Sequence, residues 1–326
     1  GLLARAAADA GPIALVSCDN LPSNGRLLRG VVTRALEYAD RNLPAGAADW
    51  VRDHVRFPGT MVDRIVPAST PQTLADARRA LGVVDLAAVA AEPYRQWVIE
   101  DDFPGGRPAW ERAGAVLTRD AGPWERLKLR TLNGLHSAAA YLGALAGRQT
   151  IAEAVRIPHL TTVLRRLVAE EVAVSFTPPE GVSVVDYGEE VLARFANPVI
   201  RHRTTQIAMD GSQKLPQRVL HTIADLRVAG LRPRWTALVV AAWMRFTQGR
   251  TDDGTALPLD DPLAERIRTA LAGARSSPEG VAEALFGLTE IFPAELAADD
   301  EVREPVVEWL RALHRHGVEQ TLAGAG

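Results

Sequence analysis

The hydrophobic pattern of the chain changes near Ala121, and this change limits the folds that the chain can adopt. Before it, short apolar runs lie between stretches of helical periodicity; three of these runs cover Ile13 to Cys18, Met61 to Val66, and Trp97 to Glu100. Such runs predict strands, and strands that alternate with helices indicate an α/β region. After Ala121 the helical periodicity continues almost to the last residue. The pattern therefore predicts an α/β part followed by a mostly α-helical part.

Helix boundaries are predicted from the proline, glycine and polar residues that flank the periodic stretches. In the first part, a helix is expected from Gly25 to Arg41, with one apolar face. In the second part, Pro123 opens a helix that runs to Ala146 and that Gly147 closes. The other predicted helices cover Ile151 to Val172, Tyr187 to Phe195, Pro216 to Ala229, Arg234 to Gln248, Asp261 to Ala274, Pro278 to Leu288, and Asp299 to Ala323.

The composition is that of an ordinary globular protein of 326 residues, 47% hydrophobic and 24% charged. With a net charge of -3, the chain lacks the excess of positive charge that is typical of proteins that bind nucleic acid or an anionic membrane. Cys18 is the only cysteine, which leaves no disulfide framework and no multi-cysteine metal site. No apolar run approaches the roughly 20 residues of a membrane span, and no signal-peptide pattern opens the chain. We expect a cytoplasmic protein that binds neither nucleic acid nor membranes.

Several familiar catalytic motifs are absent from the sequence. It contains no G-x-G-x-x-G after a strand, no G-x-x-x-x-G-K-[ST], no H-E-x-x-H and no G-x-S-x-G. The seven histidines are scattered, and His314 and His316 would point apart on a helix because they are two residues apart. The sequence thus favours chemistry that uses no bound metal ion.

The segment Pro123 to Ser137 concentrates polar groups on one predicted helix. At the spacing of a regular α-helix, Glu125, Lys128, Asn133 and His136 fall within an arc of roughly 140°. Gly134 lies in the same helix, where glycine costs about 1 kcal/mol relative to alanine. This cost indicates close approach by another helix or by a ligand. Taken alone, the pattern also fits a solvated polar face.

Five sequence blocks, in order, resemble those of the mannitol dehydrogenase family, the polyol-specific long-chain dehydrogenases. The blocks are S-C-D-N-L-P-S-N-G at 17–25, F-P-G-T-M-V-D-R-I at 57–65, E-P with Q-W-V-I-E-D at 92–101, K-x4-N-G-x-H-S at 128–137, and N-P followed by D-G-S-Q-K-L-P at 197–216. The resemblance implies that residues 1–117 are the C-terminal part of a Rossmann-type dinucleotide-binding domain. Residues 118–326 would then form the helical catalytic and substrate domain.

The resemblance also implies a metal-free dehydrogenase mechanism. Lys128 would be the general acid/base that takes the hydroxyl proton as hydride leaves to the nicotinamide. The amides of Asn24 and Asn133 would donate to the oxygen that becomes alkoxide-like. His136 would bind and orient a neighbouring substrate hydroxyl. Asn24 is also consistent with the simpler role of a helix N-cap.

Two acids and the cofactor contacts complete the implied site. Asp63 would lie near the nicotinamide, and Glu125 would relay protons between the lysine and water. The cofactor contacts are Asp19, Asn20, Asn24 and Asp63, with NAD as the expected cofactor and NADP left open. From the residues alone, Asp63 also fits a pair with a neighbouring group, and Glu125 fits a first-turn acid that complements the helix dipole.

The predicted substrate is a small sugar alcohol or sugar acid. Gln206 stands where polyol-oxidising members of the family tend to carry an arginine, and the cations around it, including Arg201 and Lys214, suit a substrate carboxylate. This resemblance favours a hexonate or hexuronate of the mannonate and fructuronate type. A neutral polyol of the mannitol type is the alternative, and an inactive helical module is a further one.

The glycine-rich half of the resembled nucleotide-binding domain is missing from this sequence. We therefore expect a missing N-terminal lobe that would normally lie in the same polypeptide. The apolar run Ile13 to Val16 is of a kind that neighbours cover on both faces. Left uncovered, it would favour self-association of this chain.

Overall fold

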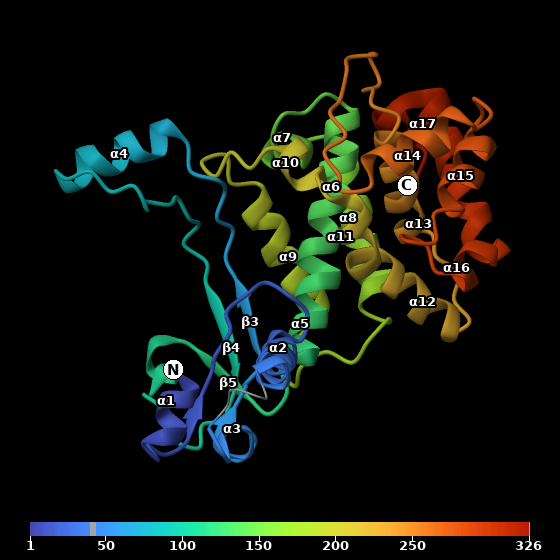
Figure 1. Cartoon of the computed structure of the whole chain (residues 1–326). Helices are drawn as coiled ribbons and strands as arrows, with labels where there is room; N and C mark the ends of the chain where they lie inside the picture. Colours follow the sequence, from blue (N-terminus) through green and yellow to red (C-terminus); the bar gives the residue numbers. More distant parts are fainter. Residues whose placement is uncertain (40–43, 326) are drawn as a thin grey trace. The chain divides into compact units, whose positions relative to one another are not determined.

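The chain divides into two compact units, Gly1–Glu125 and Arg126–Gly326. In the computed structural model, residues 1–39 and 44–325 are described. Figure 1 colours the first unit from blue to green and the second from green to red. All strands of the described residues lie in the first unit, and the second is helical. The predicted order, an α/β part followed by a helical part, is confirmed.

Two small sheets organise the first unit. In one, β1 (Ile13–Ala14) pairs in parallel with β2 (Val55–Arg56). In the other, β4 (Gln96–Glu100) is the central strand, antiparallel to β3 (Thr60–Asp63) and parallel to β5 (Val116–Thr118). The parallel pair β1 and β2 places two strand ends, and the loops that follow them, at the same edge of the sheet.

The predicted strands differ from the observed ones in length. The strand expected from Ile13 to Cys18 forms a ladder only over Ile13–Ala14, because the backbone beyond Leu15 turns into a loop. The strand expected from Met61 to Val66 ends at Asp63, where the Ile65 N–H leaves the ladder and donates to the Glu92 carboxylate at 2.6 Å. The short strands β2 and β5 were not predicted.

The helices of the first unit are α1 (Leu2–Ala7), α2 (Asn24–Ala39), α3 (Ala47–His54) and α4 (Pro71–Leu81), with a 3₁₀ turn, η2 (Trp110–Ala113). Of the helix predicted for residues 25–41, the end at Arg41 lies outside the described residues. Helix α4 lies on the excursion between β3 and β4, away from both sheets (Figure 1).

Helix α2 covers the core of the first unit with one side only. Its residues Leu28, Val32 and Leu36 pack against a cluster formed by Val51, Val55 and Phe57. Two further apolar residues of this helix are exposed to solvent. Leu27 and Val31 are 50% and 57% exposed.

The second unit consists of helices, three of them π-helical. The π-helices are η3 (Lys128–Asn133), η4 (Leu167–Val172) and η5 (Pro216–Leu220). Helix α5 (Gly122–Leu127) precedes η3 directly. The remaining helices are α6 (Gly134–Leu145), α7 (Ile151–Ala154), α8 (Leu160–Arg166), α9 (Val184–Phe195), α10 (Thr204–Ala208), α11 (Gly211–Leu215), α12 (His221–Val228), α13 (Trp235–Phe246), α14 (Ala264–Ala272), α15 (Pro278–Phe286), α16 (Ala294–Ala298) and α17 (Asp300–Ala323).

Helices α6 and α13 form the centre of the second unit, where they pack against each other. Every residue of α6 is buried, and so is every residue of α13 except Arg245. Gly143 lets α7 approach, because a Cβ there would lie 2.5 Å from that of Ala154. The single helix predicted from Ile151 to Val172 is instead broken between α7 and α8, where His159 has a φ of +67°.

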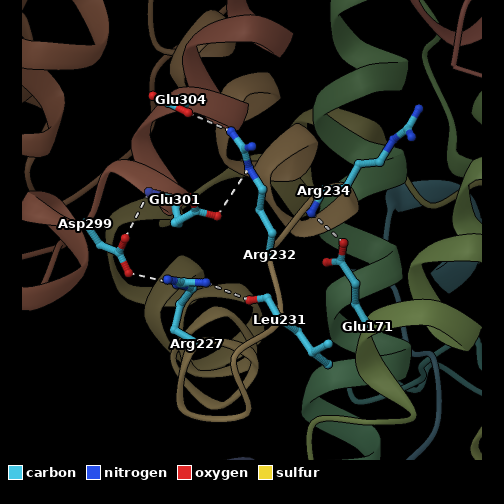
Figure 2. A network of polar contacts seen from close by, with 8 residues as sticks. All are labelled: Glu171, Arg227, Leu231, Arg232, Arg234, Asp299, Glu301 and Glu304. Atoms are coloured by element: carbon cyan, nitrogen blue, oxygen red, sulfur yellow. Dashed lines mark hydrogen bonds and ion pairs between the residues drawn. The ribbon is translucent and has the colours of Figure 1, made fainter.

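A network of polar contacts holds the start of α13 in place (Figure 2). The buried Glu171 carboxylate accepts the backbone N–H groups of Arg234, Trp235 and Thr236 at 2.6–2.9 Å. These are donors that the first turn of a helix cannot satisfy internally. On helix α12, which precedes α13 in the chain, Arg227 pairs with Asp299 at 2.8 Å. This ion pair joins α12 to the start of α17.

Candidate active site

In the first unit, the Asn24 side chain joins the loop that follows β1 to the first residue of β3. Its Nδ2 donates to the carbonyls of Ser17, Asp19 and Thr60 at 3.0–3.2 Å, and its Oδ1 accepts the Thr60 N–H at 2.9 Å. The residue is 2% exposed. Asn24 therefore organises this edge of the sheet.

Close backbone contact explains the glycines of the same loops. A Cβ on Gly25 would lie 2.4 Å from the Phe57 carbonyl oxygen and 2.8 Å from the Gly59 nitrogen. The Gly59 N–H in turn donates to Glu100 Oε2 at 2.7 Å, and Glu100 Oε1 accepts the Ala121 N–H at 3.2 Å. The family-like blocks at 17–25, 57–65 and 92–101 thus meet in one hydrogen-bonded arrangement.

The two predicted acids of this unit differ in environment. Asp63 is buried at the end of β3. Glu125 is partly buried in the first turn of α5, where both carboxylate oxygens accept the Ser23 N–H at 3.0 Å. Ser23 precedes Asn24 directly, so Glu125 supports the loop that carries Asn24. Asp19 and Asn20 are exposed on that loop.

In the second unit, Lys128 and Asn133 are the first and last residues of the π-helix η3, and both are 7% exposed. The uniform α-helical spacing assumed for this segment is therefore wrong between these residues. A π-helix bonds residue i to residue i+5 and has a wider turn, and such segments are frequent at functional sites. The arc calculated for the polar side chains does not apply here.

Gly134 allows a close helix contact, as its place in the sequence predicts. A Cβ on this residue would lie 3.2 Å from the Arg218 carbonyl oxygen of η5. The approaching group is another helix and not a ligand. This contact brings η5 against the start of α6, the helix that carries His136.

The His136 ring is buried between two other rings. It stacks on Phe195 with centroids 4.5 Å apart, and its edge meets His202 at 4.9 Å. Its Nε2 is buried and has no hydrogen-bond partner among the described residues. Burial, followed by the nearby His202 and the cations Arg218, Arg194 and Lys214, holds the pKa of His136 well below its usual value.

Two of those cations are themselves partly buried. The Lys214 ammonium donates to the Met209 carbonyl at 2.6 Å and lies 3.6 Å from Asp210. Burial, and then the charge of Arg218, lowers the pKa of Lys214. Arg218 donates to Ser137 Oγ at 3.1 Å, and burial lowers its pKa as well. The positive charges of Lys214 and Arg218 therefore lie near His136, and the Asp210 carboxylate lies beside Lys214.

The Asp210-Gly211 pair fixes the helix that carries Lys214. Asp210 adopts a left-handed conformation with φ +55°, immediately before α11. A Cβ on Gly211 would lie 2.5 Å from Trp243 Nε1 and 2.9 Å from the Tyr141 hydroxyl. Glycine is needed here because α11 packs so closely against α13 and α6.

The other predicted substrate residues have different surroundings. Gln206 is partly buried on α10, whereas Arg201 is exposed in the preceding loop with φ +46°. The prediction did not include His202, although it lies beside Arg201 in the same run of residues. The sequence alone does not show that this histidine faces His136, because α6 and the loop before α10 are far apart in the chain.

The structure therefore places the predicted residues in two sets. Asp19, Asn20, Asn24 and Glu125 belong to the same edge of the first unit, and Asp63 lies in its buried strand β3. Residues Lys128, Asn133, His136, Gln206 and Lys214 belong to the second unit. The resemblance implies that both sets belong to one active site, and this stays a prediction.

Two statements of absence hold for residues 1–39 and 44–325. Among these residues, no group of three or more His, Cys, Asp or Glu side chains is arranged to hold a metal ion. Within the same ranges, every helix is too short or too polar to cross a membrane.

Family models match both parts of the chain. The mannitol dehydrogenase Rossmann domain matches residues 1–112, and the mannitol dehydrogenase C-terminal domain matches residues 120–314. These matches cover most of the sequence and agree with the α/β and helical units. The chain belongs to the mannitol dehydrogenase family.

Known relatives cover almost the whole chain. It is 44% identical over 324 residues to the uncharacterized oxidoreductase YdfI of Escherichia coli strain K12, covering 99% of this chain and 65% of that protein. It is 41% identical over 309 residues to D-mannonate oxidoreductase of the same organism, covering 95% and 62%. A structure of Pseudomonas fluorescens mannitol 2-dehydrogenase in a ternary complex with NAD and D-mannitol matches with a TM-score of 0.84 at 32% identity, covering 99% and 65%. The chain thus spans slightly less than two thirds of the length of each relative.

Proposed function

We propose that the protein is an NAD-dependent oxidoreductase that interconverts a secondary alcohol and a ketone of a sugar acid, of the D-mannonate and D-fructuronate type. Membership of the mannitol dehydrogenase family supports the reaction class. The observation that carries the preference for an acid is the positive charge of Lys214, Arg218 and Arg194 around His136. The 41% identity to D-mannonate oxidoreductase agrees with this choice.

The cofactor is proposed to bind at the first unit. Ligands of α/β sheets bind outside the carboxyl ends of parallel strands, and β1 and β2 are parallel. Asn24 joins the loop that follows β1 to the start of β3, and Asp19 and Asn20 are exposed on that loop. We assign Asp19, Asn20, Asn24 and Asp63 as NAD contacts, with NADP as the alternative cofactor. Bound NAD would accept the hydride.

The residues of the second unit are proposed to act on the substrate. Lys128 takes the hydroxyl proton, and the Asn133 amide donates to the oxygen as negative charge develops on it. His136 offers its unpartnered Nε2 to a neighbouring hydroxyl. Glu125 is the proposed proton relay, and Lys214, Gln206 and Arg201 are the proposed contacts to the acid end. In this proposal the mechanism uses no metal ion.

Lys128 and Lys214, the only lysines of the chain, provide a direct test. The protein, expressed from its full reading frame, would be assayed for NAD reduction by D-mannonate. Lys128→Ala should lower kcat by roughly 10²- to 10⁴-fold, the usual contribution of a positioned acid/base. Lys214→Ala should mainly raise KM, because it removes a binding contact. Equal effects of both substitutions on KM, with kcat unchanged, would refute the role of Lys128.

Oxidation of a neutral polyol is the second candidate. The structural match to mannitol 2-dehydrogenase in complex with D-mannitol favours it. D-mannitol would then be the better substrate, and Lys214→Ala would impair its oxidation as much as that of D-mannonate. If the protein oxidises neither compound, the result would support the further alternative, in which the chain is an inactive helical module. A cytoplasmic location is retained as part of the proposal.

A further inference from the structure

Two unpartnered imidazole nitrogens lie close together in the second unit. His136 and His202 meet edge to face with centroids 4.9 Å apart. His136 Nε2 and His202 Nδ1 are both buried, and neither has a hydrogen-bond partner among the described residues. Buried polar atoms are nearly always hydrogen-bonded in native proteins. Two such atoms on touching rings indicate a place where a polar ligand completes the missing bonds.

The charges around this pair are mainly positive. Cations act on His136 from three elements, Arg194 from α9, Lys214 from α11 and Arg218 from η5. Asp210 and Asp261 act on Lys214 in the opposite sense. Asp261 is itself held by the Ser212 N–H at 2.8 Å and the Ser212 hydroxyl at 2.5 Å.

The Tyr141 hydroxyl lies beside Gly211 at the start of α11, and burial raises its pKa, so that it stays uncharged. Burial, and then Lys214, lowers the pKa of His202 to about 4. Near neutral pH both imidazoles are therefore uncharged, and Lys214 and Arg218 bring positive charge to the pair, together with Arg194. An anionic ligand group suits this balance better than a neutral hydroxyl.

We propose that His202 is a specificity-determining residue whose Nδ1 donates a hydrogen bond to the carboxylate of the sugar-acid substrate, beside the hydroxyl that binds His136. This inference rests on the proposed function and adds a residue to it. A carboxylate only accepts hydrogen bonds, so His202 binds it in the tautomer that carries the proton on Nδ1. Lys214 lies close enough to influence His202 and adds its charge to the same ligand group.

Two substitutions of His202 that place a polar atom at different positions test its contact with the substrate carboxylate. In His202→Asn the side-chain amide takes the approximate place of Nδ1, whereas in His202→Gln it takes the place of Nε2. His314→Asn is the matched control, because His314 lies on α17 and contacts Gln248. Each variant, expressed from its full reading frame, would be titrated with D-mannonate or D-mannitol by calorimetry. NADH would be present, because it cannot accept a hydride and turnover is avoided.

We expect His202→Gln to weaken D-mannonate binding about tenfold or more, as loss of a hydrogen bond to a charged group does. His202→Asn and His314→Asn should stay within about threefold of the unmodified protein, since the bond is retained or untouched. D-mannitol affinity should change little in any variant. Equal weakening for D-mannonate and D-mannitol, or no weakening in His202→Gln, would overturn the inference. An unmodified protein that binds neither compound would overturn the proposed function and this inference with it.

Proton uptake provides a second readout that a merely structural role of His202 would not change. A bound carboxylate raises the pKa of a neighbouring imidazole. D-mannonate should therefore bind more tightly as the pH falls from about 7 to 5, with protons taken up from the buffer. His202→Asn should abolish most of this uptake and keep the binding. The same uptake in His202→Asn as in the unmodified protein would contradict the assignment.

Discussion

Gly211 is a position where a single methyl group would disturb the helix that carries Lys214. Its Cβ would lie 2.5 Å from Trp243 Nε1 and 2.9 Å from the Tyr141 hydroxyl. Gly211→Ala should lower the free energy of unfolding by about 1–3 kcal/mol, as overpacking of a core does. Gly30→Ala on α2 is the control, because open space surrounds Gly30, and it should raise stability by up to about 1 kcal/mol. Urea unfolding measures both changes, and an unaffected Gly211→Ala would refute the contact.

His202 should make stability depend on pH. Its pKa is about 4 in the folded protein and about 6.5 in an unfolded chain. The unfolded chain therefore binds a proton between these values that the folded protein does not, so stability is lost as the pH falls through this window. His202→Asn should remove up to about 3 kcal/mol of this loss. Urea midpoints at several pH values would test it, and an unchanged slope in the variant would contradict the prediction.

Single residues of the site were easier to predict than their neighbours. The spacing of Lys128, Asn133 and His136, together with the resemblance, selected residues that the structure shows to be buried in one unit. The pairing of His136 with His202 was not predictable, because the residues are 66 positions apart and no local pattern connects them. The hydrogen bonds of Asn24 were not predictable for the same reason, because Thr60 lies in β3, 36 positions further along the chain.

At the scale of elements, helix α13 depends on a charge supplied by a different helix. Glu171 in η4 accepts three N–H groups at the start of α13, and its negative charge also suits a helix N-terminus. Glu171→Ala should destabilise the protein by about 2–4 kcal/mol, because buried donors lose their acceptor. Glu301→Ala, which removes an exposed ion pair with Arg232, should cost under about 1 kcal/mol. Thermal and urea unfolding of the two variants measure the difference, and similar effects would argue against the capping role.

Helix positions were largely predictable from apolar periodicity, and their internal geometry was not. The stretch Arg234 to Gln248 was expected as a helix and contains α13. The π-helix at Lys128–Asn133 was missed, because its wider turn leaves no signal in the apolar pattern. The two-residue strand β2 is too short for a periodic pattern, and only its pairing with β1 defines it.

At the scale of the molecule, the exposed face of α2 should promote self-association. Leu27 and Val31 are half exposed on adjacent turns of this helix. Replacing both with serine should reduce self-association of the chain, because burial of their apolar surface drives it. Val228→Ser on α12 is the control, since Val228 is 90% exposed and lies in the other unit. Sedimentation equilibrium provides the masses, and a chain that is monomeric throughout the measured range would refute the prediction.

The preference between an acidic and a neutral substrate tests the central claim most directly. The measurement is kcat/KM for NAD reduction by D-mannonate and by D-mannitol, made with the protein expressed from its full reading frame. The cations around His136 predict that D-mannonate is preferred by about tenfold or more, the effect of roughly one charge-assisted hydrogen bond. An equal or higher kcat/KM for D-mannitol would contradict the assignment of a sugar acid as the substrate.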